Sequence, residues 1–338
     1  MVSIGRVVLV VFGLAMLVLY IELLASVSSI QASLSFEDIP ADMRSVVDVS
    51  ANSKLANKKI LVAYSGPTSL DRSEGKNELY LRNFDFFLEH GVDCQHQDTV
   101  IALTESVEQV YRDQLARLDR DCQTRGRRVY TLLRDLDCHD LATVHTLFYN
   151  STVPTRTYDY FVYINCGMTG PAPDLKGSWL LPFVEPLSET VKMSGLSVNC
   201  FRKNSPHVQS MAYALDRIGL DIVLESPSIF DCRQEFSQNE RNNAFNKIVI
   251  RYERGMSKAI LEKGYGLASI VWPGVVFWDN RTNCTLIDRW GEANLKKTFG
   301  GRLPHLNETI FFKSSRLLPK EIAQLIDYPG EPSWHAER

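Results

Sequence analysis

Two pairs of aspartates in this sequence have the spacing that could hold a divalent cation. Asp135-Leu136-Asp137 follows the apolar stretch 128–133, whereas Asp119-Arg120-Asp121 ends a charged stretch. Two carboxylates beyond a strand can bind Mn²⁺ or Mg²⁺ against a diphosphate, and the ion then offsets the phosphate charge. The first pair is the better placed, because the second has the surroundings of a solvated helix surface.

The stretch 158–171 predicts a buried strand that ends in a tight loop. Tyr160 to Ile164 are aromatic and β-branched in a run too short for a helix, and Asn165, two glycines and a proline follow. Ligands bind beyond the carboxyl ends of strands in open α/β sheets, so this loop is a candidate binding site. An ordinary strand and turn is the alternative. Because Asn165-Cys166-Gly167 stands where a metal-dependent enzyme of such architecture carries an Asp-x-Asp pair, we expect no metal site in this loop.

Nucleophilic chemistry is a second possibility. Cys166 and His207 could form a thiol–imidazole pair, since imidazole accepts protons near neutral pH. The alternatives are a disulfide or core cysteine at Cys166 and a hydrogen-bonded loop residue at His207. The sequence contains no Gly-x-Ser-x-Gly, Walker or His-Glu-x-x-His motif, which excludes the commonest hydrolase, nucleotidase and metalloprotease classes.

Strand and helix patterns alternate along the first half of the folded region. The predicted strands are Lys59–Tyr64, Thr99–Leu103, Arg128–Leu133 and Tyr160–Ile164, and the predicted helices are Leu79–His90, Glu105–Leu118 and Leu141–Tyr149. This alternation predicts an α/β fold with a mostly parallel central sheet flanked by helices. We expect the strand ends at Leu133 and Ile164 to be adjacent, which would bring Asp140 and Asn165 to the same edge.

Three further elements are expected downstream. Val191–Val198 predicts a strand, and Met211–Ile218 predicts a short helix capped by Gly219. Asn243–Lys263 is a long helical pattern with an apolar stripe that ends at Gly264. Within it Glu253 is a polar residue that the stripe does not require.

The composition is that of a globular protein. The 338 residues are 45% hydrophobic and 23% charged, with a net charge of −3, and they are enough for a substantial core. This near-balance of charge argues against a nucleic-acid-binding protein with a broad basic face.

Residues 1–28 predict a membrane-targeting segment. The apolar run from Val7 to Ile21 lies between the roughly 20 residues of a spanning helix and the roughly 7–15 of a signal-peptide core. Small residues near Ala25 would suit cleavage, whereas Glu22 suits a retained anchor. We expect an uncleaved transmembrane signal anchor, with Arg6 holding the short tail in the cytosol.

The remainder would then be lumenal, with a stem at 29–58, a folded domain at 59–320 and a tail at 321–338. Asn-x-Ser/Thr sequons for N-glycosylation support this topology and lie at Asn150, Asn280, Asn283 and Asn307. All seven cysteines follow the apolar segment, where an oxidising lumen would let some of them pair. The odd number leaves at least one thiol free or paired between chains.

Six blocks between about Lys59 and Lys313 resemble a family of glycosyltransferases related to the bacterial rhamnan-synthesis type, which has membrane-anchored eukaryotic members. The blocks are Asn83-x-x-Phe86-Phe87-x-Glu89-His90-Gly91; Asp135-x-x-Cys138-x-Asp140-Leu141; Tyr158-Asp159-Tyr160 with Ile164-Asn165 and Gly170-Pro171; Gly195-Leu196-Ser197; Pro206-His207-Val208-Gln209-Ser210 with Asp216 and Gly219-Leu220; and Tyr252-Glu253-x-Gly255-x-Ser257 with Gly264-Tyr265. Their order and spacing are more specific than any one block.

The resemblance implies a GT-A, Rossmann-like domain that moves a sugar from a nucleotide-sugar donor to a glycan or glycoprotein acceptor in the Golgi or endoplasmic reticulum. The donor-binding residues would be Asp140, Asn165, Gly167 and Gly170. The acceptor base would be one of His207, Asp216 and Glu253. No cofactor follows from these residues, and a divalent cation (Mn or Mg) at Asp135 and Asp137 is the less favoured alternative.

The sequence departs from the family at three positions. Leu136 and Ala142 stand where members commonly have Asn and Gly, and Thr169 stands where they have an arginine before Gly-Pro. An arginine there could pair with the donor phosphate, which threonine cannot do. A catalytically silent relative that binds glycan or scaffolds other transferases is therefore the alternative function, and a secreted hydrolase is a third one that lacks a recognisable nucleophile.

Overall fold

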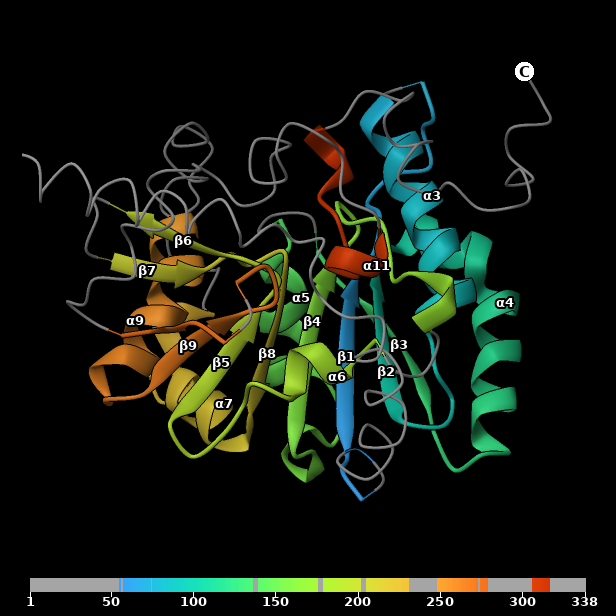
Figure 1. Ribbon diagram of the computed structural model, residues 1–338. Coiled ribbons are helices and arrows are strands. Elements are labelled where there is room, and N and C mark those ends of the chain that lie inside the picture. The colour runs from blue at the N-terminus through green and yellow to red at the C-terminus, as the bar shows by residue number, and fades with distance from the viewer. Residues whose placement is uncertain are drawn as a thin grey trace, which may run out of the picture. The chain divides into compact units, whose positions relative to one another are not determined.

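A mixed sheet of eight strands forms the centre of the fold (Figure 1). The computed structural model describes residues 55, 57–73, 75–135, 139–175, 179–201, 205–230, 248–272, 274–278 and 306–316. The strand order is β10-β9-β5-β8-β4-β1-β2-β3. These strands are β1 Ile60–Ser65, β2 Gln97–Leu103, β3 Val129–Leu133, β4 Tyr160–Asn165, β5 Val191–Gly195, β8 Ala212–Asp216, β9 Gly266–Ser269 and β10 Val276–Phe277.

The sheet is mostly parallel, as the sequence predicts. β1 pairs in parallel with β2 and β4, and β2 does so with β3. β8 is antiparallel to both β4 and β5, so β5 and its parallel neighbour β9 run in the same direction as β4. β10 is antiparallel to β9. A separate antiparallel ladder joins β6 (Val198–Phe201) to β7 (Ser205–Val208).

Helices flank both halves of the sheet. They are α3 Gly75–His90, α4 Glu105–Gln123, α5 Leu141–His145, α6 Leu181–Val184, α7 Arg217–Leu224, α9 Arg254–Glu262 and α11 Leu306–Thr309. Two π-helical turns, Thr146–Asn150 and Val249–Glu253, extend α5 and precede α9. Figure 1 shows α3 and α4 beside β2 and β3, and α7 and α9 beside β5 and β9.

Alternation along β1 divides the core between two faces of the sheet. On one face Tyr64 stacks on Phe84 and Phe87 of α3, and Phe87 contacts Trp179 edge to face. On the other face Leu61 and Ala63 belong to a cluster with α5, α7 and α9. The apolar residues of α3 that recur at helical spacing are buried: Leu81, Phe84, Phe87 and Leu88.

The stretch Met211–Ile218 forms a strand where its sequence predicts a helix. Residues 212–216 are β8, and α7 begins at Arg217. β8 is buried between β4 and β5, so it lacks the alternation of polar and apolar residues that identifies a half-exposed strand. Gly219 does not end a helix. It lies in the first turn of α7, where a Cβ would be 2.2 Å from the carbonyl oxygen of Lys192.

Two other elements differ from their sequence-based prediction. The single strand expected over Val191–Val198 is divided into β5 and the start of β6. His207, expected in a loop, lies in β7. The described part of the expected helix Asn243–Lys263 is helical from Ile248 to Glu262, and its first turn lies outside the described residues.

Three of the four described cysteines are disulfide-bonded. Cys94 and Cys122 form a disulfide that joins the end of α4 to the segment before β2, and Cys200 is disulfide-bonded as well. Cys166 is buried and free.

The described residues do not include the predicted anchor at 1–28, nearly all of the stem at 29–58 or the tail at 321–338. Among the residues that are described, no helix is long and apolar enough to cross a membrane.

Candidate functional site

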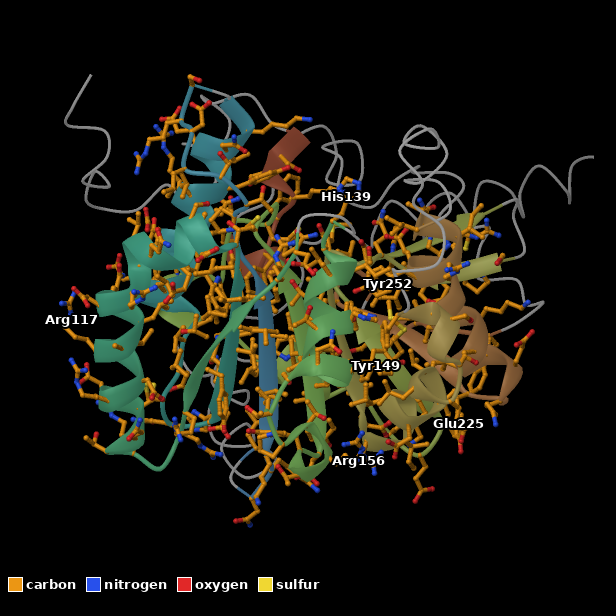
Figure 2. All side chains as sticks on the ribbon, turned by 180° about the vertical axis from the view of Figure 1, so that it is seen from behind. Arg117, His139, Tyr149, Arg156, Glu225 and Tyr252 are labelled. Carbon is orange, nitrogen blue, oxygen red and sulfur yellow. A yellow bond between two sulfur atoms is a disulfide. The ribbon has the colours of Figure 1, made fainter. Side chains whose placement is uncertain are left out.

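A cavity of about 460 Å³ opens at the carboxyl ends of β1, β3 and β4, a size within the range of small-ligand pockets. In Figure 2, His139, which lines the cavity, lies toward the end of the strands opposite Arg156, and Tyr252 lies between the two. The polar or charged side chains that line it are Thr68, Lys76, Tyr80, Arg134, His139, Asp140, Asn165, Ser210, Tyr252, Glu253, Lys313 and Ser315.

Asp140 and Asn165 are in direct contact in this cavity. The Asn165 amide nitrogen donates a hydrogen bond of 2.5 Å to the Asp140 carboxylate. The two residues therefore lie at one edge as predicted, but the expected adjacency of their strands is wrong, because β1 and β2 lie between β3 and β4. α5, which begins directly after Asp140, packs against β1.

The loop after β4 is held from two sides. Asn165 Oδ1 accepts a hydrogen bond from the backbone N–H of Gly167, and the buried Asn83 amide donates to the carbonyl oxygen of Cys166. Asn83 also accepts from the hydroxyl of Thr169. Asn83 therefore has a structural role, because its side chain holds the loop that carries the candidate binding residues.

Gly167 lines the cavity, whereas Gly170 does not. A Cβ at Gly167 would lie 3.1 Å from Asn165 Oδ1, and a Cβ at Gly170 would lie 2.4 Å from the backbone oxygen of Ile310. Gly170 also has a φ of +142°, which favours glycine. Gly170 therefore allows close packing of the loop against Ile310 and Phe311, outside the cavity wall.

Arg134 lies at the end of β3, almost fully buried and part of the cavity wall. Its Nη1 donates to the carbonyl oxygen of His139 at 2.8 Å, and its Nη2 donates to that of Gly66 at 3.0 Å. Its Nε has no hydrogen-bond partner among the residues that the structure describes.

Glu253 is the second carboxylate of the lining. Its Oε2 accepts from the backbone N–H and the hydroxyl of Ser210, and its Oε1 lies 3.5 Å from Nε2 of His207. Burial alone would raise the pKa of Glu253, but the hydrogen bonds from His207 and Ser210 outweigh it and lower the pKa below its usual value. Glu253 is thus held as a carboxylate.

His207 lies behind Glu253. It is 6% exposed and is not part of the cavity wall, so its position suits orienting Glu253 better than contacting an acceptor. One turn further along the same helical segment, the Ser257 hydroxyl accepts from the backbone N–H of Val208. Glu253 and Ser257 together fix the path of the chain between β7 and β8.

Asp216 lies at the other end of the sheet. It pairs with Tyr160, the first residue of β4, whereas the cavity lies beyond Asn165 at the opposite end of that strand. Its carboxylate caps α7 by accepting from the N–H of Gly219 and forms an ion pair of 2.7 Å with Lys192. Asp216 therefore has a structural role in these contacts, and it does not line the cavity that holds Asp140, Asn165 and Glu253.

The Cys166 thiol is not a candidate nucleophile. Burial raises its pKa to about 12, with Asp140 adding to the increase and Arg134 opposing it, and only the thiolate is strongly nucleophilic. His207 contacts Ser205 and Glu253 rather than this thiol. The pair that the sequence allows is therefore not assembled.

Three buried tyrosines lie near Asp140, and Tyr252 among them lines the cavity. Tyr163 stacks on Tyr213, whose hydroxyl lies 3.0 Å from that of Tyr252. Burial, followed by nearby charges that include Asp140, raises the pKa of Tyr163 and Tyr252. These hydroxyls stay protonated and can donate hydrogen bonds.

The described lining offers few side chains that could bind a divalent cation. Asp140 and Glu253 are its only carboxylates, and both accept hydrogen bonds from neighbours. No cluster of three or more His, Cys, Asp or Glu side chains suited to a metal occurs in the described residues. Asp135 is exposed and outside the cavity wall, and Asp137 lies outside the described residues.

Of the four sequon asparagines, only Asn150 has a side chain that the structure describes. Asn150 is exposed at the end of the π-helical turn after α5, as a glycosylation acceptor must be. Asn280 and Asn283 lie outside the described residues, as does the side chain of Asn307.

Several lining residues cannot be identified from the sequence patterns. Lys76 and Tyr80 belong to α3, and Lys313 and Ser315 come from a segment more than 140 residues beyond β4. Arg134 could have been found, since it directly follows a predicted strand, but the neighbouring Asp-x-Asp pair is the stronger pattern.

No protein-family model matches the chain, and neither does any curated protein. Solved structures with a similar arrangement include 4-diphosphocytidyl-2C-methyl-D-erythritol synthase from Anaerococcus prevotii, at 9% identity over 74% of this chain and 97% of that one, with a TM-score of 0.39. A mannosyltransferase from Pyrobaculum calidifontis, in complex with GDP-mannose and Mn²⁺, is 14% identical over 67% of this chain and 58% of that one, with a TM-score of 0.37.

Glucosyl-3-phosphoglycerate synthase from Mycobacterium tuberculosis, in complex with Mn²⁺, UDP and phosphoglyceric acid, is 13% identical over 62% of this chain and 81% of that one, with a TM-score of 0.29. Each of these three TM-scores is below 0.5, so the similarities do not bear on the activity of this chain.

Proposed function

We propose that this protein is a glycosyltransferase, which moves a sugar from a nucleotide-diphospho-sugar donor to a hydroxyl group of a glycan or glycoprotein. The observation that carries the proposal is the composition of the cavity at the carboxyl ends of the strands. Cationic side chains from three separate segments and the Asp140–Asn165 pair line one space of about 460 Å³. A nucleotide-sugar offers matching chemistry, because it joins an anionic diphosphate to a hydroxyl-rich sugar and nucleoside.

Asp140 and Asn165 suit the uncharged end of the donor. The carboxylate accepts hydrogen bonds from sugar or ribose hydroxyls, and the amide can both donate and accept. The contact between them fixes both side chains before a ligand arrives, which reduces the conformational entropy lost on binding. Gly167 lets the donor approach the loop backbone closely.

Glu253 is the acceptor base in this proposal. As the hydroxyl oxygen attacks the anomeric carbon and the bond to the diphosphate breaks, the proton passes to the Glu253 carboxylate. Its hydrogen bonds with Ser210 and His207 hold it ionised and oriented, and a positioned carboxylate can act as a general base.

We further propose a single-pass type II topology with the domain in the lumen of the Golgi or endoplasmic reticulum, and kinship with the rhamnan-synthesis type of transferase. The disulfide Cys94–Cys122 and the exposed sequon at Asn150 support an oxidising, glycosylating compartment.

The alternative is a catalytically silent relative that binds glycan or scaffolds other transferases. Its main support in the sequence is Thr169, where the resembled family carries an arginine. The Thr169 side chain is fully buried against Asn83 and is not part of the cavity wall. The substitution therefore alters loop packing rather than the cavity itself.

The test is to incubate the full chain with a panel of nucleotide sugars and a glycan acceptor, and to measure nucleotide release with added Mn²⁺ and with EDTA. A transferase releases the nucleotide from at least one donor, and Glu253→Gln reduces that release. Absence of release for every donor, together with glycan binding, would favour the silent relative.

A further inference from the structure

Arg134 carries a buried charge without a carboxylate partner among the described residues. It is 7% exposed, and its two hydrogen bonds go to backbone carbonyl oxygens. A guanidinium has five N–H donors, so most of its hydrogen-bonding capacity is not used by these contacts, and Nε has no partner. A buried charge is costly unless it is compensated, and the cavity is the open side from which an anion could reach it.

The charges around the cavity also favour an anion. Lys76 from α3 and Lys313 from the segment after α11 line it together with Arg134. Each of the two lining carboxylates has a hydrogen-bonded neighbour, Asn165 at Asp140 and Ser210 at Glu253, and His207 lies 3.5 Å from Glu253. The ionic groups of the described lining are thus three cations and two anions.

The shape of the guanidinium indicates which anion fits. Its planar fork matches the oxygens of a phosphate group and can bind them through two parallel hydrogen bonds. Its contacts with Gly66 and His139 hold it between the loops that follow β1 and β3, so it is fixed in place before a ligand binds. The cavity, moreover, offers no carboxylate cluster suited to a metal within the described residues.

We propose that Arg134, assisted by Lys76 and Lys313, binds the diphosphate of the donor and compensates its charge directly, in place of a divalent cation. When the sugar is transferred, the bond between the anomeric carbon and the diphosphate oxygen breaks, and the bonding electrons stay on that oxygen. Arg134 then stabilises the extra negative charge of the leaving nucleoside diphosphate. This inference rests on the proposed function, but it predicts behaviour toward diphosphates that can be measured without any sugar transfer.

The experiment is calorimetric titration of the full chain with UDP, GDP and inorganic pyrophosphate in EDTA, and again with Mn²⁺. We expect the wild-type protein to bind pyrophosphate and at least one nucleoside diphosphate in EDTA. We expect Arg134→Met to weaken that binding about tenfold to a hundredfold, the usual effect of losing a charged hydrogen bond. Binding that requires Mn²⁺ would overturn the proposal.

A second measurement separates anion binding from a structural role of Arg134. The affinity ratio between a nucleoside diphosphate and its parent nucleoside should fall in Arg134→Met and recover partly in Arg134→Lys, whereas damage to the fold would lower both affinities together. Arg217→Met is the matched control, because Arg217 also donates to a backbone carbonyl but lies beside Asp216 at the other end of the sheet and pairs with Asp221.

The outcomes distinguish this inference from the proposed function. An unchanged affinity ratio in Arg134→Met, in a protein that binds nucleotide sugars, overturns the inference alone. Binding of pyrophosphate that depends on Arg134, without binding of any nucleotide sugar, supports the anion site and overturns the proposed function.

Discussion

Glu253 contributes to stability through its charge, because the folded protein holds its pKa below the ordinary value of 4.5. A depressed carboxylate pKa stabilises the fold above the unfolded pKa, and this stabilisation is lost as the pH falls through the folded pKa. We therefore expect Glu253→Gln to lower the free energy of unfolding by roughly 1–3 kcal/mol at neutral pH. The difference from wild type should shrink as the pH falls below 4.5.

Denaturant unfolding at a series of pH values checks this expectation. Glu262→Gln is the control, since Glu262 is exposed on the same helical segment. Profiles of wild type and Glu253→Gln that stay parallel below pH 4.5 would show that the carboxylate is not stabilised by its neighbours.

Gly167 acts through its lack of a side chain. A Cβ there would lie 3.1 Å from Asn165 Oδ1 and 3.6 Å from the hydroxyl of Ser315, so a larger side chain displaces Asn165 and fills the donor's path. Gly167→Val should weaken donor binding at least tenfold while the melting temperature changes little. Gly255→Val is the matched glycine control, because a Cβ at Gly255 meets no atom closer than 3.6 Å. Equal donor affinity in the two variants would remove Gly167 from the site.

At the scale of elements, Asp216 holds α7 against the sheet. It caps the helix and neutralises Lys192, which is 4% exposed. Asp216→Ala leaves that charge unpaired and should destabilise the protein on the order of 3 kcal/mol. The kcat measured at a temperature where the variant is folded should stay near that of wild type. A folded variant with lost activity and unchanged stability would return Asp216 to the list of catalytic candidates.

Local sequence patterns correctly predict the elements that bury one face and expose the other to solvent. Leu81, Phe84 and Phe87 repeat with helical spacing because α3 buries one face and exposes the other. β8 has no such asymmetry, since it is buried between two strands, and its alanines favour a helix when the sequence is considered alone. The helix predicted there fails for that reason.

The candidate site could be predicted in part. Asp140 and Asn165 both follow the carboxyl ends of predicted strands, and the sequence therefore identifies both as site candidates. The two strands themselves are not neighbours in the sheet. Lys313 reaches the cavity from the other end of the described chain, and its placement depends on the packing of Phe311 against Trp179 and Phe183. No local pattern contains that information.

At the scale of the whole molecule, the proposed topology requires that the folded domain enters the oxidising lumen of the secretory pathway. Expression of the full chain in a glycosylating cell should give a membrane-bound protein whose mass falls on enzymatic removal of N-glycans. Asn150→Gln should remove the mass of one glycan, whereas Asn77→Gln, at an asparagine outside any sequon, should not change the mass. A soluble product without glycans would contradict the proposed localisation and topology.

The central claim is that the cavity beyond β1, β3 and β4 binds a nucleotide-sugar. Donor affinity of Asp140→Asn tests it most directly, because this change keeps the size of the side chain and an oxygen that can still accept from Asn165. Loss of the carboxylate removes a charged acceptor for donor hydroxyls, which should weaken binding about tenfold or more. Asp113→Asn, on the exposed side of α4, is the control.

The measurement is equilibrium titration of the full-length wild type and both variants with a panel of nucleotide sugars in EDTA, with the melting temperature recorded beside each titration. We expect wild type and Asp113→Asn to bind at least one nucleotide sugar equally well, and folded Asp140→Asn to bind it about tenfold more weakly. Equal donor affinity in all three proteins, or no binding of any nucleotide sugar by the wild type, would contradict the central claim.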